Sequence, residues 1–130
     1  RYGNKWISMK NNLFMSIFFK LNNNINLHKL TYNCCKIVRK SLMELINCKI
    51  TIKKPNDLLI KKKKICGILQ ETLFYKNNKY VIIGVGINID NSPNIIDYPT
   101  SYLNQFTKKK ITSFQIYNEI KNNFEIYLKD

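Results

Sequence analysis

The sequence predicts an α+β domain, α/β in the broad sense, in which a mixed, largely antiparallel β-sheet is flanked by α-helices. Three observations predict it: several strand-like apolar stretches, a turn signal that joins two of them, and two stripes of apolar residues at helical spacing. With 130 residues and 45% hydrophobic content, the chain is long enough to bury one core. We therefore expect a single domain.

The N-terminal half predicts one strand followed by one helix. Residues Leu13–Leu21 form a nearly continuous apolar run, which is typical of a strand buried on both faces. The polar "NNNIN" then leads into a helix over Leu27–Asn47, with Asn26 as its N-cap. The apolar residues of this helix recur at steps of three and four, which predicts one core-facing stripe: Leu27, Leu30, Cys34, Val38, Leu42 and Leu45.

The C-terminal half predicts three strands and a second helix. A short strand over Lys49–Ile52 is ended by Pro55. Two longer strands, Ile65–Tyr75 and Lys79–Ile89, are joined at "KNNK", whose asparagines tolerate the left-handed conformation of a hairpin turn. After a loop with two prolines, a helix from about Ser113 would turn four residues inward: Ile116, Ile120, Phe124 and Tyr127.

The net charge of +14 would ordinarily suggest a nucleic-acid partner. However, the chain has 20 Lys, 19 Asn and 20 Ile but only two Arg, and the abundant residues all have AT-rich codons. Nucleic-acid surfaces favour Arg for bidentate contacts. Compositional bias therefore accounts for the charge, and we do not expect nucleic-acid binding, although a basic nucleic-acid module stays as the non-enzymatic alternative.

The cysteines, the single histidine and the hydropathy indicate an intracellular protein. None of the four cysteines forms a C-x-x-C pair, and His28 is not at a metal-ligand spacing, so core packing in a reducing compartment is expected and no protein metal site is predicted. No apolar run approaches the roughly 20 residues needed to cross a bilayer. We expect a cytoplasmic protein without a membrane partner, or one in an organelle such as a plastid.

Three stretches could carry chemistry, and each is ambiguous by itself. "VIIGVGIN" lacks the third glycine of a dinucleotide fingerprint, so its glycines indicate a strand that another backbone or a ligand approaches closely. "KKPND" places Lys53, Asn56 and Asp57 around a proline turn, where Asn and Asp often serve the turn itself. Trp6 is either a core residue or, beside Arg1, the cover of a flat ring.

Together, in order and spacing, these stretches resemble the catalytic domain of biotin protein ligases along essentially the whole chain. "RYGNKWISMKNNLFMSIFF" is similar to the family's glycine–arginine loop, Trp, Ser-Pro turn and apolar strand, entered at the second arginine. "KKPND", "KICGILQE", "GVGIN" and "YPTSYL" have counterparts in the same order. The resemblance implies a fold like that of class II aminoacyl-tRNA synthetases and of biotin and lipoate ligases.

The resemblance selects one lysine from the run Lys61–Lys64. The family's lysine stands three residues before the glycine of Gly-Ile-Leu and seven after the aspartate of Pro-Asn-Asp. Only Lys64 satisfies both spacings, with Gly67 and Asp57 as markers. The other three lysines are expected to lie, solvated, in a turn between strands.

The resemblance also implies a reaction and roles for residues. Biotin and ATP, with Mg²⁺, would give biotinyl-5′-AMP, and biotin would then pass to a lysine of a biotin carboxyl carrier domain, as in acetyl-CoA carboxylase. The implied catalytic residues are Lys64, Arg1 and Asp57. The implied biotin-binding residues are Arg1, Lys64, Gly67, Leu69 and Gly84. The implied ATP- or adenylate-binding residues are Arg1, Trp6, Lys53, Asn56, Lys64 and Asn88. A lipoate or octanoate transferase is the alternative enzyme.

The chain departs from the family pattern at three positions. Asn4 replaces a loop arginine, Met9 replaces the proline after Ser8, and Lys54 replaces the Trp before Pro-Asn-Asp. We expect residues 1–130 to be a catalytic domain truncated at its N-terminus, with no C-terminal β-domain. The oligomeric state stays open, a homodimer included.

Overall fold

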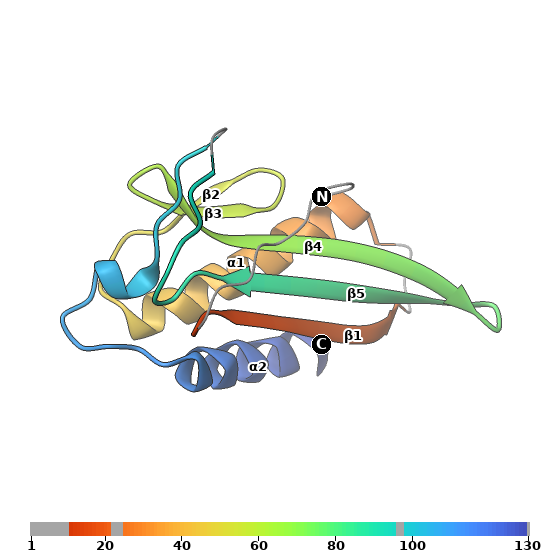
Figure 1. The fold of residues 1–130 in the computed structure, drawn as a ribbon. Helices are drawn as coiled ribbons and strands as arrows, with labels where there is room; N and C mark the ends of the chain where they lie inside the picture. Colours follow the sequence, from red (N-terminus) through yellow and green to blue (C-terminus); the bar gives the residue numbers. More distant parts are fainter. Residues whose placement is uncertain (1–10, 22–24, 96–97, 130) are drawn as a thin grey trace.

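The structure, a computed structural model, describes residues 11–21, 25–95 and 98–129. Five strands form one sheet, and two long helices form a second layer against it (Figure 1). The expected α+β fold class is confirmed.

The sheet is antiparallel between all paired strands, in the order β1-β5-β4-β3-β2. Within the described ranges, its one parallel pairing is an isolated bridge between Lys64 and Thr100. The strands are β1 (Leu13–Leu21), β2 (Thr51–Lys53), β3 (Asp57–Ile60), β4 (Lys63–Tyr75) and β5 (Asn78–Ile87).

The two helices follow the predicted patterns. Helix α1 (Leu27–Leu45) begins after Asn26, whose Oδ1 accepts hydrogen bonds from the backbone N–H groups of His28 (2.8 Å) and Lys29 (3.1 Å). Helix α2 (Ser113–Lys129) follows a short 3-10 helix, η1 (Leu103–Gln105). The predicted inner residues are buried in both helices, except that Leu27, Leu45 and Tyr127 are only partly buried at the edge of the core.

The two faces of the sheet differ in burial. On β5, Val81, Ile83, Val85 and Ile87 are fully buried, and their partners on β1 and β4 point the same way into the helix layer. The intervening residues of the same strands lie on the other face, which no described helix covers. We call it the helix-free face.

The expectation that β1 is buried on both faces is wrong. Its burial alternates: Met15 is buried, whereas Phe14 is 54% and Phe18 is 59% exposed. The physical reason is that both helices pack on one side of the sheet, so only every second residue of β1 reaches the core. The ring of Phe18 stacks on Tyr80 of β5, with 5.3 Å between centroids.

Strand β3 was not predicted because Pro55, Asn56 and Asp57 all favour a turn and only three residues follow Asp57 before the next turn. The predicted strand Lys49–Ile52 is observed as β2, which begins two residues later and ends one residue later, and Lys63 opens β4 instead of lying in the turn. Helix α1 ends two residues earlier than expected. The β4–β5 hairpin is confirmed, with Lys76 (φ 49°) and Asn77 (φ 65°) in the left-handed region.

No helix within the described ranges is long and apolar enough to span a bilayer.

Candidate functional site

One row of residues runs across all five strands on the helix-free face. Lys53 pairs with Asp57, Asp57 with Gly67, Gly67 with Gly86, and Gly86 with Phe14. Residues that pair directly in an antiparallel sheet project from the same face. A lysine, a carboxylate and two glycines predicted from three separate motifs are therefore neighbours in space.

Lys64 joins this row because of an irregularity in the pairing of β3 with β4. Leu58 pairs with Cys66 but Leu59 pairs with Lys64, so Ile65 is the extra residue of a β-bulge. Strict alternation would have put Lys64 on the core side with Cys66. Instead its Nζ lies 3.1 Å from Asp57 Oδ1, on the helix-free face, with the two side chains 15% and 9% exposed.

Lys64 differs from the other lysines of its run because its backbone is hydrogen-bonded to the segment around residue 100. Its backbone N–H donates to Pro99 O (3.0 Å), and its carbonyl accepts from Ser101 N (2.9 Å). Its Nζ lies 5.1 Å from the ring centroid of Tyr98, a residue that sequence reasoning did not single out. Lys61, Lys62 and Lys63 are exposed, as expected of solvated lysines.

Beside this row, the next residues of β4 and β5 on the helix-free face are apolar or glycine. Leu69 pairs with Gly84, one step along from the Gly67–Gly86 pair. A Cβ at Gly84 would meet the ring of Phe14 at 3.4 and 3.6 Å, so the absence of a side chain there makes room for that ring. In this arrangement the ring of Phe14 lies over Gly84; Gly84 and Gly86 are buried, and Gly67 is partly buried.

Asn88 lies at the end of β5, buried among polar contacts. Its Nδ2 donates to Ser101 O (3.2 Å), and its backbone N–H donates to Ile65 O (2.8 Å). Asn12, which sequence reasoning missed, supports the same loop. Its Oδ1 accepts from three successive backbone N–H groups, those of residues 89, 90 and 91, at 2.8, 3.1 and 3.3 Å, and its Nδ2 lies 3.4 Å from Asn88 Oδ1.

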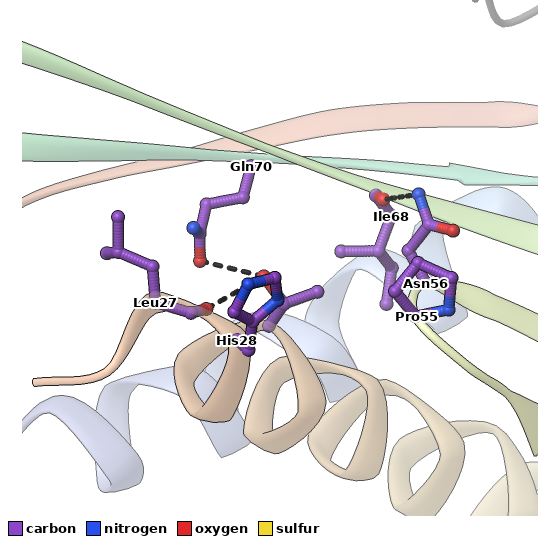
Figure 2. Close-up of a pocket in the computed structure, with 7 residues that line it drawn as sticks. Leu27, His28, Pro55, Asn56, Ile68 and Gln70 are labelled. Carbon is purple, nitrogen blue, oxygen red and sulfur yellow. Dashed lines mark hydrogen bonds between the residues drawn. The ribbon is translucent and has the colours of Figure 1, made fainter. Parts of the chain in front are cut away.

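Asn56 lies on the opposite side of the sheet from Lys64. Its Nδ2 donates to Ile68 O (2.8 Å), and its carbonyl accepts from Ile68 N (2.9 Å). Figure 2 shows it, with Pro55, across a cavity of about 330 Å³ from His28 and Gln70. The structure therefore brings Asp57 to Lys64 but turns the neighbouring Asn56 towards the helix layer.

Some of the remaining predicted residues lie in the described ranges, and the others fall outside them. Lys53 is exposed at the end of β2, in register with Asp57. Lys54, which replaces the family's Trp, lies with its Nζ 5.0 Å from the ring centroid of Tyr32 on α1. Arg1, Asn4, Trp6 and Met9 fall outside the described residues.

The cysteines contribute to the core. All four are free thiols, and Cys34, Cys35 and Cys66 are buried between α1 and the sheet. Burial raises the pKa of Cys34 to about 12, with a smaller contribution from Cys35. Burial also raises the pKa of Cys35 to about 12, with Asp57 adding to it, and raises the pKa of Cys66. These thiols are inert packing groups at neutral pH.

Within the described ranges, no group of three His, Cys, Asp or Glu side chains could hold a metal ion. The arrangement presents a partly buried ammonium group, its carboxylate partner and a strip of glycine backbone that carries no Cβ atoms. An ammonium in this setting can hold an anionic ligand such as a carboxylate or phosphate, and the glycine strip can seat an apolar ring close to the backbone.

Comparisons with known proteins identify the family to which the chain belongs. The family model of the biotin/lipoate A/B protein ligase family matches residues 1–88. The bifunctional ligase/repressor BirA of Bacillus subtilis (strain 168) is 36% identical over 104 residues, which are 76% of this chain and 31% of that protein.

Two solved structures are similar over nearly the whole chain. The biotin protein ligase of Aquifex aeolicus in complex with biotin and ATP has a TM-score of 0.81 at 28% identity and covers 99% of this chain and 55% of that one. The biotin protein ligase of Leishmania major in complex with biotinyl-5-AMP has a TM-score of 0.80 at 25% identity, with coverage of 95% and 57%. The chain therefore spans about a third of the curated relative and just over half of each structure. It belongs to the biotin/lipoate A/B protein ligase family.

Proposed function

We propose that this chain carries the site of an ATP-dependent biotin–protein ligase, which forms biotinyl-5′-AMP and transfers biotin to a lysine of a biotin carboxyl carrier domain. The observation that carries the proposal is the Lys64–Asp57 pair, 3.1 Å apart beside the glycine strip of β4 and β5. Similar proteins support it, because one is described with biotin and ATP and another with biotinyl-5-AMP.

In the first step, a biotin carboxylate oxygen attacks the α-phosphorus of ATP. The bond from that phosphorus to the bridging oxygen breaks, and pyrophosphate leaves. Two anions must meet, so the ammonium group of Lys64 holds the carboxylate and the α-phosphate together and offsets their repulsion. Mg²⁺ enters with ATP, on its phosphate oxygens.

In the second step, the uncharged amine of the acceptor lysine attacks the acyl carbon of the mixed anhydride. An amide bond forms, the acyl carbon–oxygen bond breaks, AMP leaves with the electron pair, and the amine loses a proton. Asp57 orients the amine or its proton. Gly67, Leu69 and Gly84 lie along the biotin ring system, and Lys53 supports the phosphates.

The proposal also assigns roles to residues outside this row. Arg1 grips phosphate and biotin and keeps water from the adenylate, and Trp6 packs against adenine. Asn88 contacts the nucleotide from the loop that Asn12 holds. Asn56 acts through the strand: its two hydrogen bonds to Ile68 keep β4 in register beside Gly67.

Biotin-dependent exchange of pyrophosphate into ATP by the native polypeptide tests the first step. We expect exchange that requires biotin and falls at least about 100-fold in Lys64→Ala, because the cation stabilises charge that develops in the transition state. Lys63→Ala is the matched control, since that lysine is exposed and adjacent, and should stay within about twofold.

Two results would change the proposal. Exchange that survives in Lys64→Ala would remove Lys64 from the mechanism and keep the family. A folded native polypeptide without biotin-dependent exchange would overturn the assignment to biotin.

The family includes lipoate ligases, so a separate test must establish which acid the chain activates. Exchange is measured with biotin, lipoate or octanoate as the only acid, and then with lipoate competing against biotin. Selective exchange with biotin supports the proposal. Selective exchange with lipoate or octanoate would move the chain to the alternative acyl substrate.

A further inference from the structure

Two runs of three lysines lie at the same end of the molecule. Lys61 and Lys62 form the turn between β3 and β4, Lys63 opens β4, and Lys108–Lys110 lie in the loop after η1; all six are exposed. Figure 1 shows both segments at the end of the sheet opposite the β4–β5 hairpin. The Nζ of Lys61 lies 5.7 Å from the ring centroid of Phe106, so the turn lies against the segment that leads into the second run.

Both runs are presented by loops with defined backbones. Lys61 (φ 50°) and Lys62 (φ 67°) form a tight turn closed by the pairing of Ile60 with Lys63. The second loop is closed by Asn104, whose Oδ1 accepts from Ile111 N (2.9 Å) and whose Nδ2 donates to Ile111 O (3.0 Å). Binding of a partner therefore requires little further ordering of the backbone that carries these charges.

Acidic residues are absent from the sequence around both runs. The chain has eight Asp and Glu, but stretches 58–70 and 98–118 contain none. Lys121 on α2, in contrast, lies 3.7 Å from Glu125. In space, Asp90 accepts a hydrogen bond from Asn104 and Asp57 pairs with Lys64, so two carboxylates offset part of the charge at this end. The six exposed lysines still outnumber them, and the resulting positive field extends over about a Debye length of 8 Å at physiological salt.

The six lysines flank the candidate catalytic lysine. Lys63 directly precedes Lys64, and the backbone of Lys64 is bonded to residues 99 and 101 of the segment that continues to Phe106. An acceptor lysine must bring its amine into contact with the acyl group held at Lys64. The body of its protein must then lie against the surface next to Lys64.

We propose that Lys61–Lys63 and Lys108–Lys110 form one basic docking surface for an acidic face of the carrier protein that accepts the acyl group. This inference rests on the proposed function and concerns its second step alone. Charges at the rim of an interface mainly raise the association rate and do so in a salt-dependent way. The surface should therefore speed acceptor encounter without affecting adenylation.

The test uses a variant of the native polypeptide that removes all six charges. Lys61 and Lys62 become Asn, which tolerates positive φ, and the other four become Gln. A matched control removes six exposed lysines elsewhere: Lys20, Lys29, Lys40, Lys76, Lys121 and Lys129. Three activities are compared: biotin transfer to a carboxylase carrier domain, pyrophosphate exchange, and capture of the activated biotin by hydroxylamine. The last two need no docking surface.

We expect kcat/KM for the carrier domain to fall about tenfold in the six-lysine variant at about 20 mM salt, with the difference shrinking at about 200 mM. Capture by hydroxylamine and pyrophosphate exchange should stay within about twofold in the variant, and all activities should do so in the control. Neutralising acidic residues on the carrier should produce the same loss, and combining both changes should add little further loss.

Four outcomes would overturn the docking surface. These are unchanged transfer, an equal loss in the control set, a parallel loss of hydroxylamine capture, or lost binding of a single-stranded oligonucleotide with transfer intact. The last would identify a nucleic-acid surface. An absence of exchange in the unmodified polypeptide is a separate result, which concerns the proposed function.

Discussion

The two faces of β4 and β5 have opposite roles although they belong to the same strands. Ile68 is 2% exposed against the helix layer, whereas its neighbours Gly67 and Leu69 lie on the helix-free face beside Lys64. Val85 is likewise buried between Gly84 and Gly86. The side-chain period of two places core and candidate site on alternate residues of one strand.

The same strands therefore supply both the rigid core and the residues of the candidate site. The covered face is filled with branched aliphatic side chains and inert thiols, which hold the strands in place. The helix-free face carries glycines, an ion pair and exposed rings. A site built on such strands is positioned more firmly than one on loops.

Substitutions at adjacent residues of β4 separate the two faces most strongly. Ile68→Ala should lower the free energy of unfolding by about 2–5 kcal/mol, because it opens a cavity in the core. Leu69→Ala should lower it by less than about 1 kcal/mol, since that side chain is only partly buried. Urea denaturation measures both.

The ligand should respond in the reverse order. The KM for biotin in exchange should rise about tenfold in Leu69→Ala, because a contact to the ring is lost, and stay within about twofold in folded Ile68→Ala. Equal stability losses in the two variants, or equal changes in KM, would mean that the faces are not divided in this way.

Asn12 connects β1 to the loop that carries Asn88, so its loss should affect one ligand more than the other. Asn12→Ala leaves three backbone N–H groups without their acceptor, and we expect the free energy of unfolding to fall by about 1–3 kcal/mol. The KM for ATP should rise about tenfold while the KM for biotin changes little.

Asn12→Asp is the matched variant, because a carboxylate keeps the acceptor and loses the two donations from Nδ2. Asn12→Asp should restore most of the free energy of unfolding that Asn12→Ala loses. If Asn12→Ala raised both KM values equally, the loop would not be specific to the nucleotide side.

The raised pKa values of the buried thiols predict that alkaline pH lowers the free energy of unfolding, by less than Ile68→Ala does. Unfolded cysteines ionise near pH 9, whereas the folded pKa values of Cys34 and Cys35 are about 12. Above pH 9 the unfolded state binds fewer protons, so stability falls as pH rises from 9 towards 12. Between pH 8 and 9 the free energy of unfolding should drop by about 1 kcal/mol in total.

Denaturation at the two pH values measures this drop, and the double variant Cys34→Ala, Cys35→Ala should lose most of it. Iodoacetamide at pH 8 should modify the less buried Cys48 well before the other three. Rapid modification of Cys34 in the native state would contradict a tightly packed interface between α1 and the sheet.

Much of the fold could be predicted because its signals are local. The stripe on α1, its cap at Asn26 and the hairpin at Lys76–Asn77 depend on contacts within a few residues. Strand β3 could not be predicted in this way. Its first residue, Asp57, is itself the last of three turn-forming residues, and its pairing with β4 supplies the hydrogen bonds that make it a strand.

The candidate site was partly predictable for a similar reason. Motif spacing selected Lys64 from its run and Asp57 as its marker, and the two are 3.1 Å apart. The same reasoning grouped Asn56 with them, but its amide bonds Ile68 on the other side of the sheet. Asn12 and Tyr98 went unnoticed because each reaches its partner across more than thirty residues of chain.

Sequence patterns alone were thus enough to predict both helices, every strand except β3, the core stripes and the lysine that the motifs mark. These depend on periodicity and spacing, which are properties of the chain near each residue. Only the tertiary structure decided which face of the sheet receives both helices, and that the bulge at Ile65 turns Lys64 towards Asp57. Those outcomes depend on packing between distant segments, where a shift of one residue in pairing reverses the face on which a side chain lies.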